Sequence, residues 1–276
     1  MHNLSRKVRF SIDPFLPEDS SGFNSFSSRP AGEGLSIFFE LCVELTGEVE
    51  PSTGFITNVI DIDKNVRKYV VPVFAERIRK DFRSGSHIGL PGITELLKSA
   101  RGQLADKFGT AKLNRIGLAL NPFRTITLGG EPRPNTVGRD EDCKMVYLSE
   151  KFEFAATHKL WNEQFSKQRN FEVFGKCANP TGHGHNYIVE VTIKTAADRN
   201  KLTAIADFEK TVDNELIRVV DHKNLNVDIP YFSEIIPTVE NIAAFAWERI
   251  AGKFGDSTLH CVTVWETDRT CCSYYG

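Results

Sequence analysis

The alternation of apolar and polar positions predicts a strand, two helices and a hairpin in the first half of the chain. Residues 36–45 alternate in the manner of a half-buried strand. Residues 66–78 carry apolar side chains at the i, i+3, i+4 and i+7 spacing of a helix, although Pro72 would interrupt its interior. A second helix is predicted after Pro91, and residues 113–128 have the pattern of a hairpin.

The second half repeats this order of elements. Residues 145–158 contain a strand, and residues 187–194 form another with period-two alternation. Apolar spacing predicts one helix over residues 208–220 and another that begins at the N-cap residue Thr238. Residues 259–275 close the pattern with a hairpin.

A constant offset of 146 residues aligns the two halves over about ninety residues, which indicates an internal repeat. Among the identical pairs are Glu44 with Glu190, Asp61 with Asp207, Pro91 with Pro237, Phe108 with Phe254, and Leu113 with Leu259. The alternative is two helical-pair domains with coincidental matches. We therefore predict a first domain over residues 1–128, a linker over 129–143 and a second domain over 144–276, with a Pro-, Gly- and Ser-rich loop at 17–34.

Composition and charge narrow the classes of partner. The chain has 276 residues and a formal net charge of −2, so no global basic field favours nucleic acid or an anionic membrane. No apolar run approaches a membrane span, and the N-terminal residues lack the apolar core of a signal peptide. The six cysteines do not resemble a disulfide framework. These features predict a cytoplasmic protein with reduced thiols.

Candidate chemistry gathers around the segment from Cys177 to Tyr187. His183 and His185 would point to the same face if the strand begins by residue 183. Neutral imidazole is the usual nitrogen ligand of zinc, and His158, at the end of the preceding strand, is the best third ligand. The alternative is that these histidines are polar residues at strand ends. A thiol near a zinc ion or a histidinium has a lowered pKa, so Cys177 could act as a base.

Three further candidates have structural alternatives. Asp221 beside His222 could fix the tautomer of that histidine, or His222 could simply cap a helix C-terminus. Glu266 ends an otherwise apolar strand and would pair with a cation or accept hydrogen bonds from a ligand such as an amino-pyrimidine edge. Glu240 lies in the first turn of its helix, where a carboxylate complements the helix dipole.

Six ordered motifs in the second half closely resemble the 6-pyruvoyltetrahydropterin synthase family, which includes 6-carboxytetrahydropterin synthase. The motifs lie at residues 152–158, 174–177, 179–187, 221–225, 237–241 and 264–267. The resemblance implies a tunnelling fold (T-fold), an α+β domain in which an antiparallel four-stranded sheet carries two helices on one face and oligomerises into a barrel. With the internal repeat, it predicts tandem T-fold domains and a homo-oligomer.

The resemblance also implies the roles of the candidate residues. It implies zinc held by His158, His183 and His185. Cys177 would be the proton-abstracting base, with Asp221 and His222 as the proton relay. Glu266 would anchor the pterin ring, helped by the Thr238 region, which includes Glu240.

The implied reaction converts 7,8-dihydroneopterin triphosphate to 6-pyruvoyltetrahydropterin with elimination of triphosphate, as in tetrahydrobiopterin biosynthesis. The alternatives are the carboxy-forming reaction of queuosine and other deazapurine biosynthesis, or a pterin-binding zinc domain without turnover. Five residues separate Cys177 from His183, as in the pyruvoyl-forming branch, whereas the carboxy-forming branch usually has three. Val239 departs from the family pattern, which often has a second Thr or Ser there.

The first half lacks this chemistry at the aligned positions. The offset places Ile37 and Phe39 opposite His183 and His185. The counterparts of Asp221, His222 and Glu266 are Ala75, Glu76 and Leu120. Apolar side chains cannot hold a zinc ion. We therefore expect a degenerate, structural first domain and one working site per chain.

Overall fold

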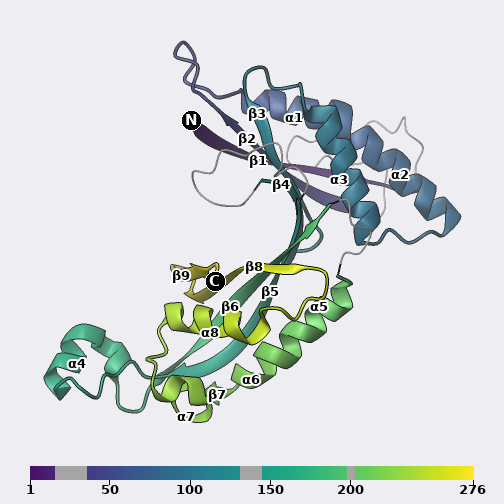
Figure 1. The fold of residues 1–276 in the computed structure, drawn as a ribbon. Helices are drawn as coiled ribbons and strands as arrows, with labels where there is room; N and C mark the ends of the chain where they lie inside the picture. Colours follow the sequence, from purple (N-terminus) through teal and green to yellow (C-terminus); the bar gives the residue numbers. More distant parts are fainter. Residues whose placement is uncertain (16–35, 131–144, 198–202) are drawn as a thin grey trace. The chain divides into compact units, whose positions relative to one another are not determined.

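The computed structural model describes residues 1–15, 36–130, 145–197 and 203–276 (Figure 1). The chain divides into two compact units: the first unit is Met1–Leu148 with Ala196–Leu202, and the second unit is Ser149–Thr195 with Thr203–Gly276. The predicted loop at 17–34 and all but the first two residues of the predicted linker lie outside the described residues. No helix in the described ranges is long and apolar enough to cross a membrane.

The sheet of the first unit contains four antiparallel strands in chain order. The strands are β1 (His2–Ile12), β2 (Ile37–Gly47), β3 (Lys112–Ala119) and β4 (Arg124–Gly129). Inward-facing side chains such as Val8, Leu41 and Ile116 are at most 1% exposed, so every second residue builds the core. The predicted strand at 36–45 and the predicted hairpin at 113–128 are confirmed.

The helices of the first unit follow β2. They are α1 (Val59–Asn65), α2 (Val71–Ser84) and α3 (Leu90–Leu104), with a π-helical turn at residues 66–70 between α1 and α2. Pro72 lies in the first turn of α2, where a proline removes no required N–H donor. The helical path therefore continues through Pro72, and Val66, Val70 and Phe74 are fully buried.

The second unit has an antiparallel sheet in the order β5 (Met145–His158), β6 (His183–Ala196), β8 (Thr258–Thr267) and β9 (Thr270–Tyr274). A two-residue strand, β7 (Lys223–Asn224), runs parallel to β5 at its end. The predicted strands and the closing hairpin are confirmed, and β6 begins at His183, as the histidine argument required.

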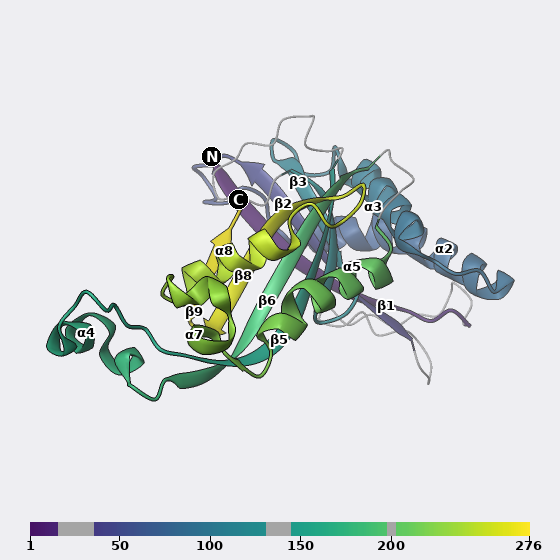
Figure 2. The ribbon, with the colours of Figure 1, turned by 60° about the horizontal axis from the view of Figure 1, so that its bottom comes forward.

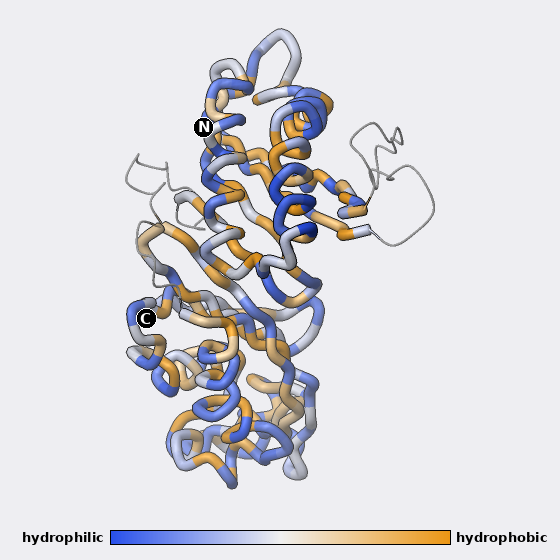
Figure 3. The backbone as a smooth tube through the Cα atoms, turned by 90° about the vertical axis from the view of Figure 1, so that its right-hand side faces the viewer, coloured by the Kyte–Doolittle hydropathy of each residue, from blue (hydrophilic) through white to orange (hydrophobic). Residues whose placement is uncertain are grey.

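Two helical segments cover this sheet, as predicted. The first comprises α5 (Ile205–Val212), a π-helical turn at residues 213–217 and α6 (Arg218–Val220), and the second is α8 (Val239–Ile250). Figure 2 shows α8 next to β8 and α5 nearer to β5 and β6. Orange hydrophobic and blue hydrophilic stretches alternate along the backbone in Figure 3, as amphipathic packing requires. The sequence pattern missed α4 (Lys167–Phe174) and α7 (Leu225–Asp228).

The two units share two irregularities of the backbone. The register shifts at a β-bulge, whose extra residue is Asn114 of β3 in the first unit and His260 of β8 in the second, and the helical segment before α3 and the one before α8 each contain a π-helical turn. Next to these bulges Leu45 pairs with Leu113 and Ile193 pairs with Leu259, so β2 and β6 correspond at an offset of 148 residues where β3 and β8 correspond at 146. The ungapped offset is therefore wrong for β2 and β6, and the bulge register aligns His185 with Ile37. Connections between elements change length more readily than strand register does.

Candidate metal and active site

Three histidines converge at the neighbouring ends of β5 and β6. His158 is the last residue of β5, and His183 and His185 are the first and third residues of β6. Their potential ligand atoms all lie within 4.8 Å of one another, and His158 Nε2 is 3.1 Å from His183 Nε2. The side chains share a face because residues two apart on a strand point the same way. The structure thus assembles the predicted histidine group.

The ring of His158 is oriented by a neighbouring carbonyl group. Its Nδ1 lies 2.8 Å from the carbonyl oxygen of Pro237, so Nδ1–H donates a hydrogen bond there and the lone pair of Nε2 faces the other two histidines. The side chain is 0% exposed, and this burial lowers the pKa of His158. A neutral imidazole with a directed lone pair is the form that binds a metal ion.

Two nitrogen atoms of the group are buried without a hydrogen-bond partner, Nδ1 of His183 and Nε2 of His185. An unpaired buried polar atom costs roughly 1–3 kcal/mol. A cation bound by three imidazoles would remove at least part of this cost. Three histidine ligands with one open position are the donor set of a catalytic zinc site, so the residues present fit zinc.

Glu266 approaches the histidines from β8. Its Oε1 lies 3.4 Å from Nε2 of His158 and 3.5 Å from Nε2 of His185, and its side chain is 19% exposed. The three histidines alone form the metal-binding group found among the described residues. The carboxylate therefore borders the group, where it can meet both a cation and a ligand bound beside it.

Cys177 lies in a short 3-10 turn, Gly175–Ala178, that follows α4. Its carbonyl oxygen accepts a hydrogen bond from the backbone N–H of Leu160 at 2.9 Å, which ties the turn to the end of β5. Burial, and to a lesser degree the charge of Glu266, raises the pKa of the Cys177 thiol. The sequence predicts a lowered pKa for this thiol. That lowering requires the positive charge of a zinc ion or a histidinium beside it, and burial alone acts in the opposite direction.

Asp221 and His222 form a pair, as one interpretation of the sequence required. Asp221 Oδ2 is 2.8 Å from Nδ1 of His222, and Asp221 Oδ1 accepts the backbone N–H of Ala155 at 2.9 Å. The backbone hydrogen bond to Ala155 is the main cause that lowers the pKa of Asp221. His222 has a φ of 55°, in the left-handed region that a residue just after a helix often adopts.

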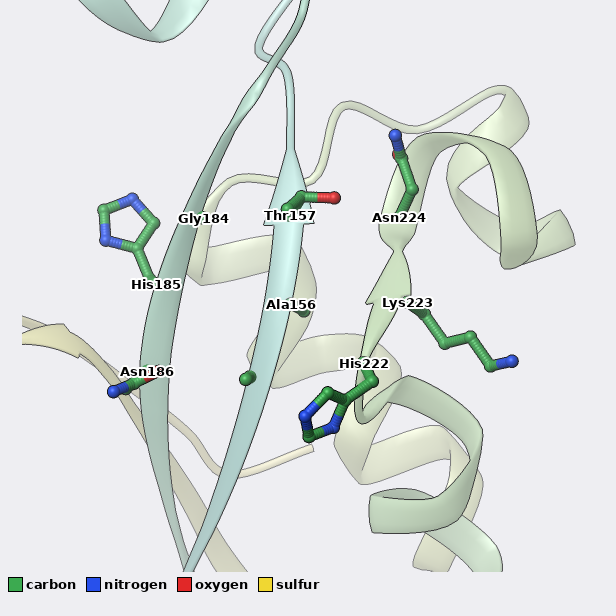
Figure 4. Close-up of a pocket in the computed structure, with 9 residues that line it drawn as sticks. Ala156, Thr157, Gly184, His185, Asn186, His222, Lys223 and Asn224 are labelled. Carbon is green, nitrogen blue, oxygen red and sulfur yellow. The ribbon is translucent and has the colours of Figure 1, made fainter.

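The Asp221–His222 pair does not reach Cys177 within the second unit. The side chain of His222 is 82% exposed, and in Figure 4 its ring and the ring of His185 lie on opposite sides of β5 and β6. It borders a pocket of about 540 Å³ between β5, β6 and β7. In the ranges that the structure describes, no hydrogen bond or ion pair joins the pair to Cys177 or to the three histidines.

The two remaining predicted residues lie at the start of α8. Thr238 is the N-cap, as predicted, since its side chain accepts from the backbone N–H of Asn241 at 3.4 Å. The preceding residue, Pro237, holds His158. Glu240 is exposed in the first turn. The hydrogen bonds and ion pairs of the described residues do not connect Glu240 to the histidine group.

The sequence analysis missed Asn170, which organises the segment between His158 and Cys177. Asn170 is fully buried, and its Oδ1 accepts the backbone N–H of Asn162 at 2.8 Å. Its Nδ2 faces three backbone carbonyl oxygens, those of Asn162, Phe165 and Ser166. One asparagine in a polar segment has no periodic signal, so only the folded contacts identify it.

The histidine group predicts that the metal-free protein loses stability on acidification. Burial is the main cause that lowers the pKa of His158 and of His183 below the ordinary 6.5. The unfolded chain therefore binds more protons below pH 6.5, so the free energy of unfolding falls as the pH falls from there toward the lowered values. Urea unfolding of the metal-free protein at several values between about pH 7.5 and pH 5, which span the ordinary pKa of histidine, measures this fall in the free energy of unfolding. His183→Gln should show a shallower loss, and equal slopes would contradict the assignment.

Known proteins match the half of the chain that contains the histidine group. The family model described as 6-pyruvoyl tetrahydropterin synthase matches residues 147–276. The 6-pyruvoyl tetrahydrobiopterin synthase of Homo sapiens is 35% identical over 144 residues, which are 51% of this chain and 99% of the human protein. That of Drosophila melanogaster is 36% identical over 135 residues, 48% of this chain and 80% of the fly protein.

A solved structure shows the same coverage. The 6-pyruvoyl tetrahydropterin synthase of Caenorhabditis elegans is 31% identical, with a TM-score of 0.44, and the match covers 48% of this chain and 96% of that chain. About half of this chain thus matches between 80% and 99% of the length of these relatives.

Proposed function

The chain belongs to the 6-pyruvoyl tetrahydropterin synthase family, a family of lyases, and on this premise we propose that its second unit converts 7,8-dihydroneopterin triphosphate to 6-pyruvoyltetrahydropterin with loss of triphosphate. The observation that supports this most is the group of three histidines with unpaired buried nitrogens, bordered by Glu266. The half of the chain that contains it is the half that the family model matches.

His158, His183 and His185 would hold one zinc ion. When bound, the ion would supply Lewis-acid polarisation of the side-chain oxygens of the substrate and a template that orients them. Pro237 fixes the tautomer of His158 through its carbonyl, so the ring cannot rotate without losing a buried hydrogen bond. The protein thereby places three neutral imidazoles before any ligand arrives.

Cys177 and Glu266 would act on the substrate from two sides. The Cys177 thiolate would take a proton from a side-chain carbon, and a cation among the histidines would oppose the rise of its pKa that burial causes. Glu266 would accept hydrogen bonds from the N–H donors of the pterin ring, since a carboxylate accepts two in parallel. Thr238 and Glu240 would border the pterin at the start of α8.

Asp221 and His222 would move protons as a relay. Asp221 accepts from Nδ1–H of His222, which leaves Nε2 free to exchange a proton with a substrate. Because the ring is exposed and does not contact Cys177 in its own unit, it is available to a substrate held by a second copy of the chain. A homo-oligomer would supply that copy.

The direct test is incubation of the purified protein with zinc and 7,8-dihydroneopterin triphosphate, followed by identification of the product by mass. A pyruvoyl product with free triphosphate supports the proposal. The carboxy product would identify the deazapurine branch, against which the five-residue separation of Cys177 and His183 counts. Bound but unchanged substrate would identify a pterin-binding domain.

Glu266→Gln is expected to weaken binding of the pterin ring by about tenfold or more, because a charged acceptor is replaced by a neutral group with one N–H donor facing the ring donors. Pterin fluorescence titration measures the dissociation constant. Glu248→Gln removes the same charge from an exposed position on α8 and serves as the control. If both variants bind pterin as the wild type does, Glu266 has no role as the anchor.

We further propose that the first unit is a degenerate copy of the same fold. The shared bulge and the shared π-helical turn support common descent of the two units. Phe10 and Phe39 stack at 5.2 Å in the first unit, much as Phe154 and Tyr187 stack at 4.9 Å in the second. The apolar Ile37 at the position that corresponds to His185 cannot ligate a metal ion.

A structural first unit has a consequence for metal content and assembly. We expect one zinc ion per chain, and elemental analysis that finds two tightly bound ions would contradict this. The terminal strands β1 and β9 have outer edges that need a partner or protection. A fused copy would halve the number of chains that a barrel of T-fold domains requires.

A further inference from the structure

Three consecutive residues at the end of β5, His158 to Leu160, connect separate parts of the candidate site. The ring of His158 belongs to the histidine group. The backbone of Lys159 is held by Asn226, and the backbone N–H of Leu160 donates to the carbonyl of Cys177. The position of this tripeptide therefore relates the metal ligand to the thiol.

Asn226 holds Lys159 through both ends of its amide. Its Oδ1 accepts the N–H of Lys159 at 2.7 Å, and its Nδ2 donates to the carbonyl of the same residue at 3.0 Å. This is the hydrogen-bond pattern of one residue in a strand ladder, supplied by a side chain. Two bonds to one residue restrict both its translation and its rotation.

The side chain takes over where the backbone ladder ends. Strand β7 pairs with β5 at Ala156 and Thr157, and the chain then turns into α7 at Leu225. Asn224 caps α7 by accepting the N–H of Asn226 at 3.1 Å. The amide of Asn226 thus extends the pairing past His158, to a position that the backbone of β7 no longer reaches.

The backbone at Gly182 packs closely against the same tripeptide. A Cβ placed on Gly182, which has a φ of 71°, would lie 2.8 Å from the carbonyl oxygen of His158. The backbone before β6 therefore packs directly on the residue that carries the metal-binding ring. Asn226 at Lys159 and the backbone of Gly182 at His158 therefore both restrict the peptide after His158.

We propose that Asn226 is a positioning residue, whose amide clamps Lys159 and thereby sets the distance between the metal-binding histidines and Cys177. Its effect on turnover rests on the proposed function, but its effect on the tripeptide does not. The same segment carries Asp221 and His222, so the clamp also couples the proton relay to the end of β5. Asn226 itself touches no reacting atom in this assignment.

Three variants separate positioning from general stability. Asn226→Ala removes both bonds, and Asn226→Asp keeps the acceptor for the N–H of Lys159 but has no donor for its carbonyl. Asp228→Ala is the matched control, because Asp228 accepts the N–H of Asn224 at 2.8 Å within the same turn and is exposed. If Asn226→Ala fails to fold, Asn226→Asp carries the test.

The readouts are hydrogen exchange at the amide of Lys159, zinc affinity measured against a competing chelator, and kcat with KM. We expect exchange at Lys159 to accelerate about tenfold or more in Asn226→Ala, with smaller acceleration in Asn226→Asp. Zinc affinity and kcat should fall about tenfold, as for other residues that orient metal ligands, while KM stays within about twofold. Asp228→Ala should match the wild type in all of these.

Unchanged exchange at Lys159 in Asn226→Ala would overturn the clamp. Accelerated exchange with wild-type zinc affinity and kcat would leave Asn226 a structural residue only, and would overturn the positioning role. A wild-type protein that binds zinc without turnover would instead refute the proposed function. The exchange rates and zinc affinities of the variants would then test the positioning role of Asn226 without reference to turnover.

Discussion

Cys177→Ala is expected to lower the turnover of 7,8-dihydroneopterin triphosphate by roughly 10²–10⁴-fold, the usual contribution of a positioned general base. Alanine has no titratable group. The backbone of Cys177 is held near the end of β5, because its carbonyl accepts a hydrogen bond from the N–H of Leu160, two residues after His158. That bond uses the backbone and survives the substitution. The turn at residues 175–178 should therefore keep its place.

Metal content distinguishes the loss of a base from the loss of a ligand. Cys177 is not in the metal-binding group, so Cys177→Ala should retain zinc at the wild-type stoichiometry. Cys271→Ser, at an exposed position of β9, controls for removal of a thiol and should keep full activity. Activity near that of the wild type in Cys177→Ala would show that another group abstracts the proton.

His183→Ala should lower zinc affinity by at least about 100-fold. Loss of a residue that only orients a metal ligand lowers the affinity by up to about 100-fold, and loss of a ligand itself should cost at least as much. Two imidazoles and water replace three imidazoles, and the preformed geometry of the site is lost. His183 is half-buried, and its Nδ1 has no hydrogen-bond partner that the substitution would leave unpaired. The variant should fold, and turnover should fall with the metal content.

Competition with a chromogenic chelator measures the affinity of His183→Ala, and elemental analysis measures the stoichiometry. His87→Ala, in the first unit and exposed, removes a histidine without touching the group. His158→Ala is less suited to this experiment because it would also leave the Pro237 carbonyl without its partner. Full zinc binding by His183→Ala would remove that residue from the site.

Most secondary structure was predictable from the sequence because it follows from local periodicity. Alternation along β6 predicted a shared face for His183 and His185, and the strand does begin at His183. Apolar spacing predicted both long helical segments, and Thr238 is the N-cap as expected. Period-two alternation implied only that His183 and His185 share a face, whereas the meeting of His158 with them depends on the pairing of β5 with β6.

Other features were decided only by contacts between segments distant in sequence. Pro72 was ambiguous until the helical path showed it in the first turn of α2. The ungapped offset was wrong for β2 and β6, because strand register is set by pairing across the sheet. The direction of the His222 ring depends on how Asp221 attaches to β5 at Ala155, a contact across 66 residues.

Two asparagine side chains show most plainly what the periodicity of the sequence cannot predict. Asn170 and Asn226 occupy polar positions with no periodic signal, yet one organises the segment before Cys177 and the other clamps the residue after His158. Propensity and periodicity report how a residue suits its own element. An asparagine that replaces a backbone partner acts on a different element, so its role exists only once tertiary packing has brought the two backbones within hydrogen-bond distance.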